Sequence, residues 1–175
     1  MAAKDLKNTV YLDTETTGLN QDRNDEMLEI AIVDNDKNIL INTLVKPTRI
    51  RNWEGAQAIH GISPDDVKDV KTVKHIKDKI EGAIRGKDLV IYNAGYDVGI
   101  LMNAGIDVRI CNSVKCAMLE AAEIWGEWND YFESYTWMKL GAALKASGGA
   151  WEGTSHRALS DALACRHVWN AINNR

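Results

Sequence analysis

The sequence has no long apolar run, few cysteines and no excess of positive charge. A transmembrane helix needs roughly 20 consecutive apolar residues, and no stretch approaches that length, so we expect no membrane span. Residues 1–5 also lack the apolar stretch of a secretory signal. Cys111, Cys116 and Cys165 lack zinc-site spacing and indicate a reducing, cytoplasmic environment. We interpret them as small buried side chains, and a Cys111–Cys116 bond stays open.

The charge balance limits how the protein can bind nucleic acid. It has 21 basic and 25 acidic residues, for a formal net charge of −4. Broad electrostatic binding of nucleic acid needs a basic surface, so the charge balance argues against it. Binding through a small local contact area is compatible with the charge balance. The lysine-rich stretch 68–87 also carries Asp69, Asp78 and Glu81, and this mixture is typical of a solvated helix face.

Internal repeats, linkers and low-complexity segments are absent from the sequence, so we expect one domain over residues 1–175. Short β-rich runs and longer stretches with helical spacing of apolar residues predict the elements. The predicted strands span residues 9–15, 27–33, 39–45, 88–92 and 108–111. The predicted helices start at Ser63-Pro64 and then span 72–85, 96–104, 113–124, 136–146 and 157–172. This order predicts an α/β fold with a mixed sheet that opens with an antiparallel meander.

Two carboxylates end the first predicted strand. Side chains alternate along a strand, so Asp13 and Glu15 point to the same face. Two like charges there repel unless a cation lies between them, and hard divalent cations favour oxygen ligands. A polar edge strand would explain the pair equally well if it stood alone. The following Thr16-Thr17-Gly18 turn makes the pattern more specific, because backbone N–H groups in such a turn can hold a phosphate or a sugar.

A second polar group lies where the strand at 88–92 gives way to a helix. Asn93 and Asp97 follow that strand, and ligand sites in α/β sheets concentrate at the carboxyl ends of strands. Taken alone, Asp97 is better explained as an acidic residue that is favourable at a helix N-terminus. Asn93 is interpreted as a positioning residue or a loop anchor.

The third group contains the most anomalous residue of the chain. Asp161 falls on the small, apolar stripe of the last predicted helix, three residues after Ala158 and four before Cys165. A carboxylate that faces a core is unfavourable unless it is paired or metal-bound. His156 lies at the entrance of the same helix, where an exposed imidazole can transfer protons near neutral pH.

Three motifs together resemble, in order and spacing, those of the DEDDh branch of the DnaQ-like exonuclease family. They are Asp13-x-Glu15, Asn93-x-x-x-Asp97 and His156-x-x-x-x-Asp161. The family includes the proofreading subunit of bacterial replicative polymerase, ribonuclease T and oligoribonuclease. The resemblance covers residues 9–172 and includes the segment Ile59-His60-Gly61-Ile62. It implies a ribonuclease H-like fold, with a central five-stranded mixed sheet flanked by helices.

The resemblance also implies an activity and its residues: metal-dependent 3′→5′ exonuclease action that releases nucleoside 5′-monophosphates. His156 would act as the general base toward the attacking water. Two divalent cations, Mg²⁺ or Mn²⁺, roughly 3.5–4 Å apart, would be bound by carboxylates. The carboxylates are those of Asp13, Glu15, Asp97 and Asp161. Substrate contacts are expected at Thr16, Thr17, Gly18, Leu19, His60, Asn93 and Tyr96. For His60, Asn93 and Tyr96 a structural role is an equal alternative.

The substrate expected is the 3′ end of single-stranded DNA, in proofreading or repair. An RNA-trimming enzyme of the ribonuclease T or oligoribonuclease type is the alternative, because nothing in the motifs reads a 2′-hydroxyl. A different class of role is an interaction subunit acting through a polymerase or repair partner, less favoured because the sequence ends at Arg175, soon after the third motif. An inactive homologue is disfavoured because all five site residues are present. The oligomeric state is not predicted.

An aromatic segment precedes the third motif. It contains Trp125, Trp128, Tyr131, Phe132, Tyr135 and Trp137. Part of this set is expected in the core, but the spacing fits no single helical face, so we expect some rings to be exposed. Exposed rings can stack on nucleobases, which is the favoured interpretation, or dock a partner.

Overall fold

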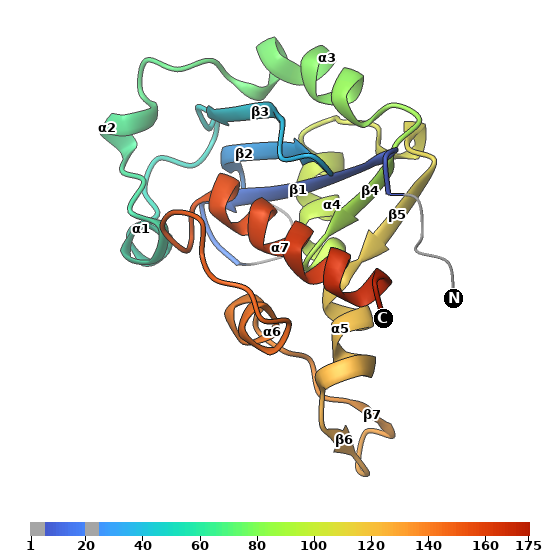
Figure 1. The fold of residues 1–175 in the computed structure, drawn as a ribbon. Coiled ribbons are helices and arrows are strands. Elements are labelled where there is room, and N and C mark those ends of the chain that lie inside the picture. The colour runs from blue at the N-terminus through green and yellow to red at the C-terminus, as the bar shows by residue number, and fades with distance from the viewer. Residues whose placement is uncertain (1–5, 20–24) are drawn as a thin grey trace.

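A five-stranded mixed sheet forms the centre of the computed structural model, which describes residues 6–19 and 25–175 (Figure 1). The expectation about a secretory signal concerns residues 1–5, outside this described part. The strands are β1 Thr9–Thr16, β2 Met27–Asp34, β3 Ile39–Leu44, β4 Asp88–Ile91 and β5 Ser113–Cys116. They lie in the order β3-β2-β1-β4-β5, with β1, β2 and β3 antiparallel in turn and β4 and β5 parallel to β1. The predicted mixed sheet with its opening meander is confirmed.

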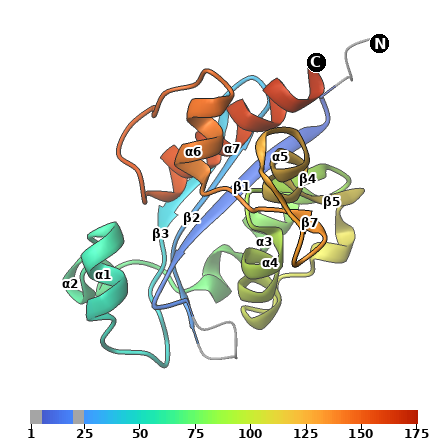
Figure 2. The same ribbon diagram turned by 90° about the horizontal axis from the view of Figure 1, so that it is seen from below.

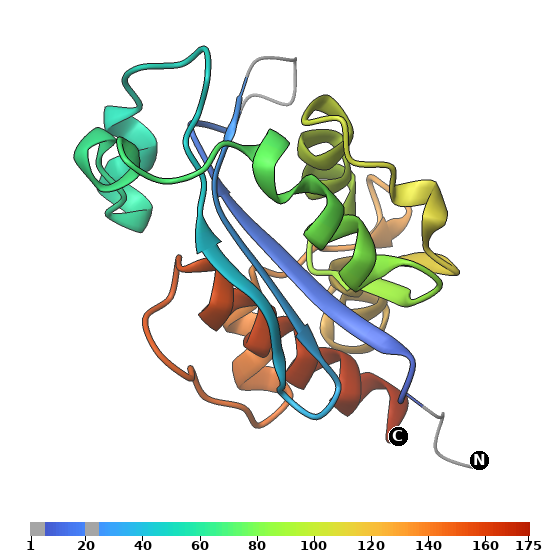
Figure 3. The ribbon, with the colours of Figure 1, turned by 90° about the horizontal axis from the view of Figure 1, so that it is seen from above.

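Helices cover both faces of this sheet. They are α1 Glu54–His60, α2 Pro64–Val67, α3 Val73–Ile84, α4 Ala94–Asn103, α5 Ala117–Trp125, α6 Leu140–Ala146, α7 Ala158–Asn173 and the 3-10 helix η1 Val108–Ile110. Seen from above, α3 and α4 lie on one side of the sheet, and α6 and α7 on the other (Figure 3). The view from below separates α1 and α2 from the other helices, beside the end of β3 (Figure 2). No helix in the described ranges is both long and apolar enough to cross a membrane.

Strand alternation divides the core into two clusters. On β1, Tyr11 contributes to the cluster shared with α5, α6 and α7, whereas Val10 and Leu12 contribute to the cluster under α3 and α4. Asp13 and Glu15 continue the face of Tyr11. The residue pattern of β1 therefore directs both carboxylates toward α7.

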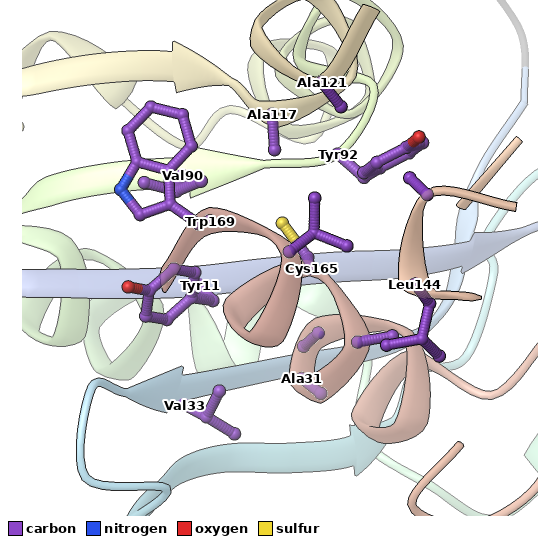
Figure 4. Close-up of a cluster of buried hydrophobic side chains, with 14 of the residues drawn as sticks. Tyr11, Ala31, Val33, Val90, Tyr92, Ala117, Ala121, Leu144, Cys165 and Trp169 are labelled. Carbon is purple, nitrogen blue, oxygen red and sulfur yellow. The ribbon is translucent and has the colours of Figure 1, made fainter. Parts of the chain in front are cut away.

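Helix α7 approaches the sheet closely because its buried stripe is made of small side chains. Ala158, Ala162 and Cys165 are fully buried against β1 and β2, together with Tyr11 and Ala31 (Figure 4). Interdigitation of small and large side chains gives a dense interior. The close packing determines where the first turn of α7 lies relative to the end of β1.

Residues 108–124 were predicted as a strand at 108–111 and a helix at 113–124, and this prediction was wrong up to residue 116. Val108–Ile110 forms η1 rather than a strand, because the Asp107 side chain accepts a hydrogen bond from the Arg109 N–H and starts a 3-10 turn. The fifth strand is instead Ser113–Cys116, which was assigned to a helix that actually begins at Ala117. Pairing with β4 and the hydrogen bond from Ser113 Oγ to Asp88 fix this edge strand.

Residues 136–139 were also wrongly assigned to a helix, since α6 begins at Leu140. The Thr136 N–H donates to the Glu127 carbonyl and extends a small hairpin that the sequence did not predict. Its strands are β6 Trp128–Asn129 and β7 Ser134–Tyr135. Its rings are largely exposed, as expected, at Trp128, Tyr131, Phe132, Tyr135 and Trp137. Trp125 is half-buried beneath the Arg175 guanidinium, 5.2 Å from its ring centroid.

The cysteines are free thiols, so Cys111 and Cys116 form no pair. Cys165 is fully buried as predicted, whereas Cys111 and Cys116 are only half-buried. The interpretation of all three as buried side chains therefore holds for Cys165 alone. Helix α1 was not predicted either, because His60 is its only buried residue and no apolar stripe marks it.

Substitutions at two glycines test how tightly the hairpin packs against the end of α5. Gly126 lies at this junction, and Gly82 on α3 is the control. A Cβ at Gly126 would lie 2.5 Å from the Ala122 carbonyl oxygen and 2.6 Å from that of Thr136. Gly126→Ala should therefore lower the free energy of unfolding by about 1–3 kcal/mol. Gly82 on α3 has open space around it, so Gly82→Ala should raise stability by up to about 1 kcal/mol. Urea denaturation followed by circular dichroism measures both, and equal effects of the two substitutions would contradict the tight junction.

Candidate active site

Three carboxylates converge at the carboxyl end of β1. One oxygen each from Asp13, Glu15 and Asp161 lies within 4.8 Å of the others. Asp13 and Glu15 share a strand face, as predicted, and Asp161 reaches them from the first turn of α7. Oxygen ligands at this spacing can hold a hard divalent cation.

Asp97 joins the cluster from the first turn of α4. Its side chain is only 4% exposed, and Oδ1 accepts hydrogen bonds from the Thr14 hydroxyl at 2.7 Å and the Thr14 N–H at 3.2 Å. These bonds tie α4 to β1 between Asp13 and Glu15. The structure thus brings all four predicted carboxylates to one end of the sheet.

His156 lies beside Asp161 in a conformation that favours glycine. Its φ is 60°, and its backbone N–H donates to Asp161 Oδ1 at 3.0 Å. The residue is exposed, at the entrance of α7. Its backbone therefore positions Asp161, while its imidazole stays available to solvent and substrate.

A pocket of about 400 Å³ opens next to Glu15. Five of the predicted substrate-contact residues line it, together with Trp53 and Ile59. The five are Thr16, Thr17, Gly18, Leu19 and His60. Leu19 is 79% exposed, so its side chain is accessible to a bound group. The pocket therefore presents apolar side chains and turn backbone next to the carboxylates.

Both ring nitrogens of His60 are used by the backbone. Nδ1 accepts from the Ile62 N–H at 3.0 Å, so in the neutral ring Nε2–H donates to the Thr16 carbonyl at 3.1 Å. Burial lowers the pKa of His60, which favours this neutral form. His60 therefore contributes a ring wall and holds the carbonyl of Thr16, and its polar atoms are not directed at a substrate.

Tyr96 holds the turn after β1. Its hydroxyl hydrogen-bonds to the Gly18 carbonyl and lies 2.5 Å from the Thr16 hydroxyl. Asn93 is exposed at the N-cap position of α4 and makes no capping hydrogen bond with its side chain. Of the two predicted contact residues on this side, Tyr96 shapes the pocket and Asn93 faces solvent.

Comparison with known proteins matches this arrangement to one family. The exonuclease family model named for RNase T matches residues 10–168. A protein called uncharacterized exonuclease CP81, from Escherichia phage 186, is 38% identical over 173 residues, which are 94% of this chain and 86% of that protein. The chain belongs to the DnaQ-like 3′→5′ exonuclease family. The prediction of a hydrolytic 3′→5′ exonuclease is confirmed.

Two further proteins are similar to this chain. The DNA polymerase III subunit epsilon of Escherichia coli (strain K12) is 34% identical over 100 residues, 53% of this chain but only 41% of that subunit. The solved structure of Exonuclease X in complex with 5′ overhanging duplex DNA is 25% identical and superposes with a TM-score of 0.67. The match covers 95% of this chain and 91% of the other.

The exonuclease has a fifth carboxylate that the sequence interpretation missed. Glu29 on β2 lies directly opposite Glu15 in the register and is 4% exposed. It accepts from Arg157 Nη2 at 2.6 Å, Arg157 Nε at 3.0 Å and the Ala158 N–H at 3.0 Å. A glutamate within the otherwise apolar strand Met27–Val33 was the available signal. It is the same kind of anomaly that identified Asp161.

Burial raises the pKa of each cluster carboxyl, and neighbouring carboxylates add to the effect. The pKa of Glu15 is raised to about 8 by burial and then by Asp161, and that of Asp13 is raised well above its usual value by burial and then by Asp97. Burial also raises the pKa of Asp97 to about 7 and that of Asp161 to about 6. Without a cation the cluster therefore holds protons near neutral pH.

These shifts predict a stability that falls with rising pH when no metal is bound. Unfolded carboxyls ionise near pH 4, so protons retained by the folded state stabilise it most below that pH. This contribution is lost as pH rises through the folded-state values of about 6 to 8. The metal-free melting temperature should fall between pH 5 and pH 8.5, and Mn²⁺ should raise it more at pH 8 than at pH 5.

Matched substitutions check which groups cause this fall of the melting temperature with pH. Glu15→Gln should flatten the upper part of the fall, because its carboxyl has a pKa of about 8. Asp69→Asn, at an exposed position far from the cluster in sequence, should leave the slope unchanged. Thermal melts at half-unit pH steps measure both variants. An identical slope in Glu15→Gln and the unmodified protein would reject the carboxylate origin.

Proposed function

We propose that the protein removes nucleoside 5′-monophosphates from the 3′ end of single-stranded DNA by two-metal-ion hydrolysis. The observation that carries this proposal is the convergence of Asp13, Glu15 and Asp161 within 4.8 Å, with Asp97 beside them. DNA is favoured over RNA because the epsilon subunit of a DNA polymerase and Exonuclease X with DNA are among the relatives at 25% identity or more. RNA trimming is the alternative that the substrate test addresses.

The carboxylate cluster fits divalent cations by the chemistry of its donors. Carboxyls that hold protons because they are buried and because they repel one another are oxygen ligands suited to Mg²⁺ or Mn²⁺. We assign the binding of two ions to four residues, Asp13, Glu15, Asp97 and Asp161. Bound cations would supply an activated water and stabilise the departing 3′ oxygen.

The protein's own residues would orient the terminal nucleotide and move the proton. The pocket beside Glu15 would take the terminal nucleotide, with turn N–H groups near Gly18 and the exposed Leu19 against the base. Tyr96 and His60 would keep this turn in place through its carbonyls. His156 would accept the proton of the attacking water, because its imidazole is exposed next to Asp161.

A second candidate function is exonucleolytic proofreading in association with a polymerase. It is supported by the epsilon subunits among the relatives, for example at 34% identity over 100 residues. Those matches cover 41% of that subunit, so the association itself is a proposal for this chain. The exposed rings of the β6–β7 hairpin, including Phe132 and Trp137, would offer either a base-stacking surface or a docking surface.

The substrate proposal is tested by digestion of 5′-labelled oligonucleotides. Single-stranded DNA, blunt and recessed duplex DNA and RNA of the same sequence are incubated with Mg²⁺, Mn²⁺ or chelator. We expect a ladder shortened from the 3′ end only with metal, and the highest rate on single-stranded DNA. Faster digestion of RNA would replace DNA by RNA in the proposal, and intact label on every substrate would reject it.

The general-base assignment predicts a selective loss in His156→Asn. Asparagine tolerates positive φ and retains the backbone N–H to Asp161, but it cannot accept the proton. The single-turnover rate should fall about 10²–10⁴-fold while Mn²⁺ affinity changes little. Asp161→Asn, the control, should lose Mn²⁺ affinity. Weakened Mn²⁺ binding with a normal rate at saturating metal in His156→Asn would assign the residue to metal binding instead.

A further inference from the structure

Glu29 differs from the four carboxylates around it in how its charge is balanced. Both of its oxygens accept hydrogen bonds, from Arg157 Nη2 at 2.6 Å and from Arg157 Nε and the Ala158 N–H at 3.0 Å. Such a bidentate contact is directional as well as charged. Glu29 also lies outside the group of oxygens spaced to hold a metal. Its carboxylate is therefore committed to the start of α7.

The start of α7 lacks a cap of its own. Arg157 is the N-cap residue, has an extended backbone and makes no capping bond with its side chain. The first N–H groups of a helix need acceptors, and negative charge is favourable there. Glu29 supplies one from the neighbouring strand by accepting the Ala158 N–H. It thus caps α7 and holds Arg157 at the same time.

The backbone conformation of His156 has to be held by contacts of the residue itself and of the residues that follow it. A residue other than glycine at φ 60° is strained and keeps that conformation only where surrounding contacts impose it. Asp161 accepts the His156 N–H on one side. On the other side Arg157 and Ala158 are held by Glu29. The chain on either side of His156 is thereby tied to β2 and to α7.

We infer that the Glu29–Arg157 ion pair positions His156 for proton transfer, an inference that rests on the proposed general-base role. Glu29 and Arg157 are positioning residues here, because they act on the reaction through the backbone of His156. The Glu29 side chain is 5% exposed and that of Arg157 is 44% exposed, and such a half-buried ion pair is by itself weak evidence for stability. Its expected effect is on turnover, through the placement of the imidazole.

The first test compares the two partners singly and together. Glu29→Gln and Arg157→Met should each lower the single-turnover rate about 10-fold at saturating Mn²⁺, and the double variant should lose no more than either single one. Mn²⁺ affinity should respond differently: Glu29→Gln removes a negative charge near the cluster and should weaken it, whereas Arg157→Met removes a positive charge and should not. Parallel losses of rate, with Mn²⁺ affinity weakened in Glu29→Gln alone, separate an effect on the position of His156 from a change in the electrostatic field at the metal site.

The second test places the same substitutions in the His156→Asn background. If the pair acts through His156, Glu29→Gln should change that residual single-turnover rate less than 2-fold. A further 10-fold loss there would overturn the inference, as would an unchanged rate for Glu29→Gln and Arg157→Met in the unmodified background. A normal rate for His156→Asn alone would instead reject the general-base proposal, so the two failures are distinguishable.

A surface ion pair in the segment before α7 provides the matched control. Lys37 Nζ lies 2.6 Å from Glu152 Oε1, and both side chains are nearly half exposed. Glu152→Gln removes this pair four residues before His156, and the single-turnover rate should stay within 2-fold. Thermal melts of all variants show whether each is folded. A 10-fold loss in Glu152→Gln would mean that any disturbance of the segment lowers turnover, and the assignment to Glu29–Arg157 would fall.

Discussion

The crowding of carboxylates at the end of β1 is the constraint on which the rest of the structure depends. Asp13, Glu15, Asp97 and Asp161 come from three elements, and a fifth carboxylate, Glu29, lies on the adjacent strand. Like charges in a poorly solvated place are unfavourable, which is why burial raises the pKa of the cluster carboxyls. The protein therefore needs a rigid frame that keeps these groups together against their repulsion.

The frame is the packing of α7 on the opening meander. Small side chains at Ala158, Ala162 and Cys165 let the helix lie close to β1 and β2, and Asp161 lies on the same helix. A larger residue in that stripe would move the first turn of α7 away from Asp13 and Glu15. The apolar core and the polar site are thus joined through one helix, and dense packing gives the site its geometry.

Each carboxylate outside β1 also has a specific donor. Asp97 accepts from Thr14, Asp161 accepts from the His156 N–H, and Glu29 accepts from Arg157 and Ala158. Hydrogen bonds to a carboxylate favour its charged form, which opposes the effect of burial. Asp13 and Glu15 instead have the most strongly raised pKa values, and binding of a cation would relieve both at once.

Sequence patterns predicted the residues that stand out from strand or helix periodicity. They did not predict the short elements that are determined by single contacts. Asp161 was recognised because it interrupts an apolar stripe, and Asp13 and Glu15 because a strand places them on one face. Glu29 interrupts β2 in the same way, but the prediction for Met27–Val33 was a strand without a site residue. Helix α1 buries only His60, and β5 is a short edge strand, so neither has a periodic signal. Asp97 and His156 depended on the family resemblance, because a helix N-terminus or a loop explains such residues equally well.

The distribution of positive charge favours local binding of a strand end over binding along the nucleic-acid backbone. Arg157 lies beside the cluster, but two of its nitrogens are bound to Glu29. Setting aside the four cluster carboxylates leaves 21 acidic residues to balance 21 basic ones. Phosphate contacts along a distant backbone release counterions and make binding strongly salt-dependent. Binding through the pocket and the carboxylate cluster would involve few such contacts, so affinity would depend on the terminal nucleotide and the metal more than on ionic strength.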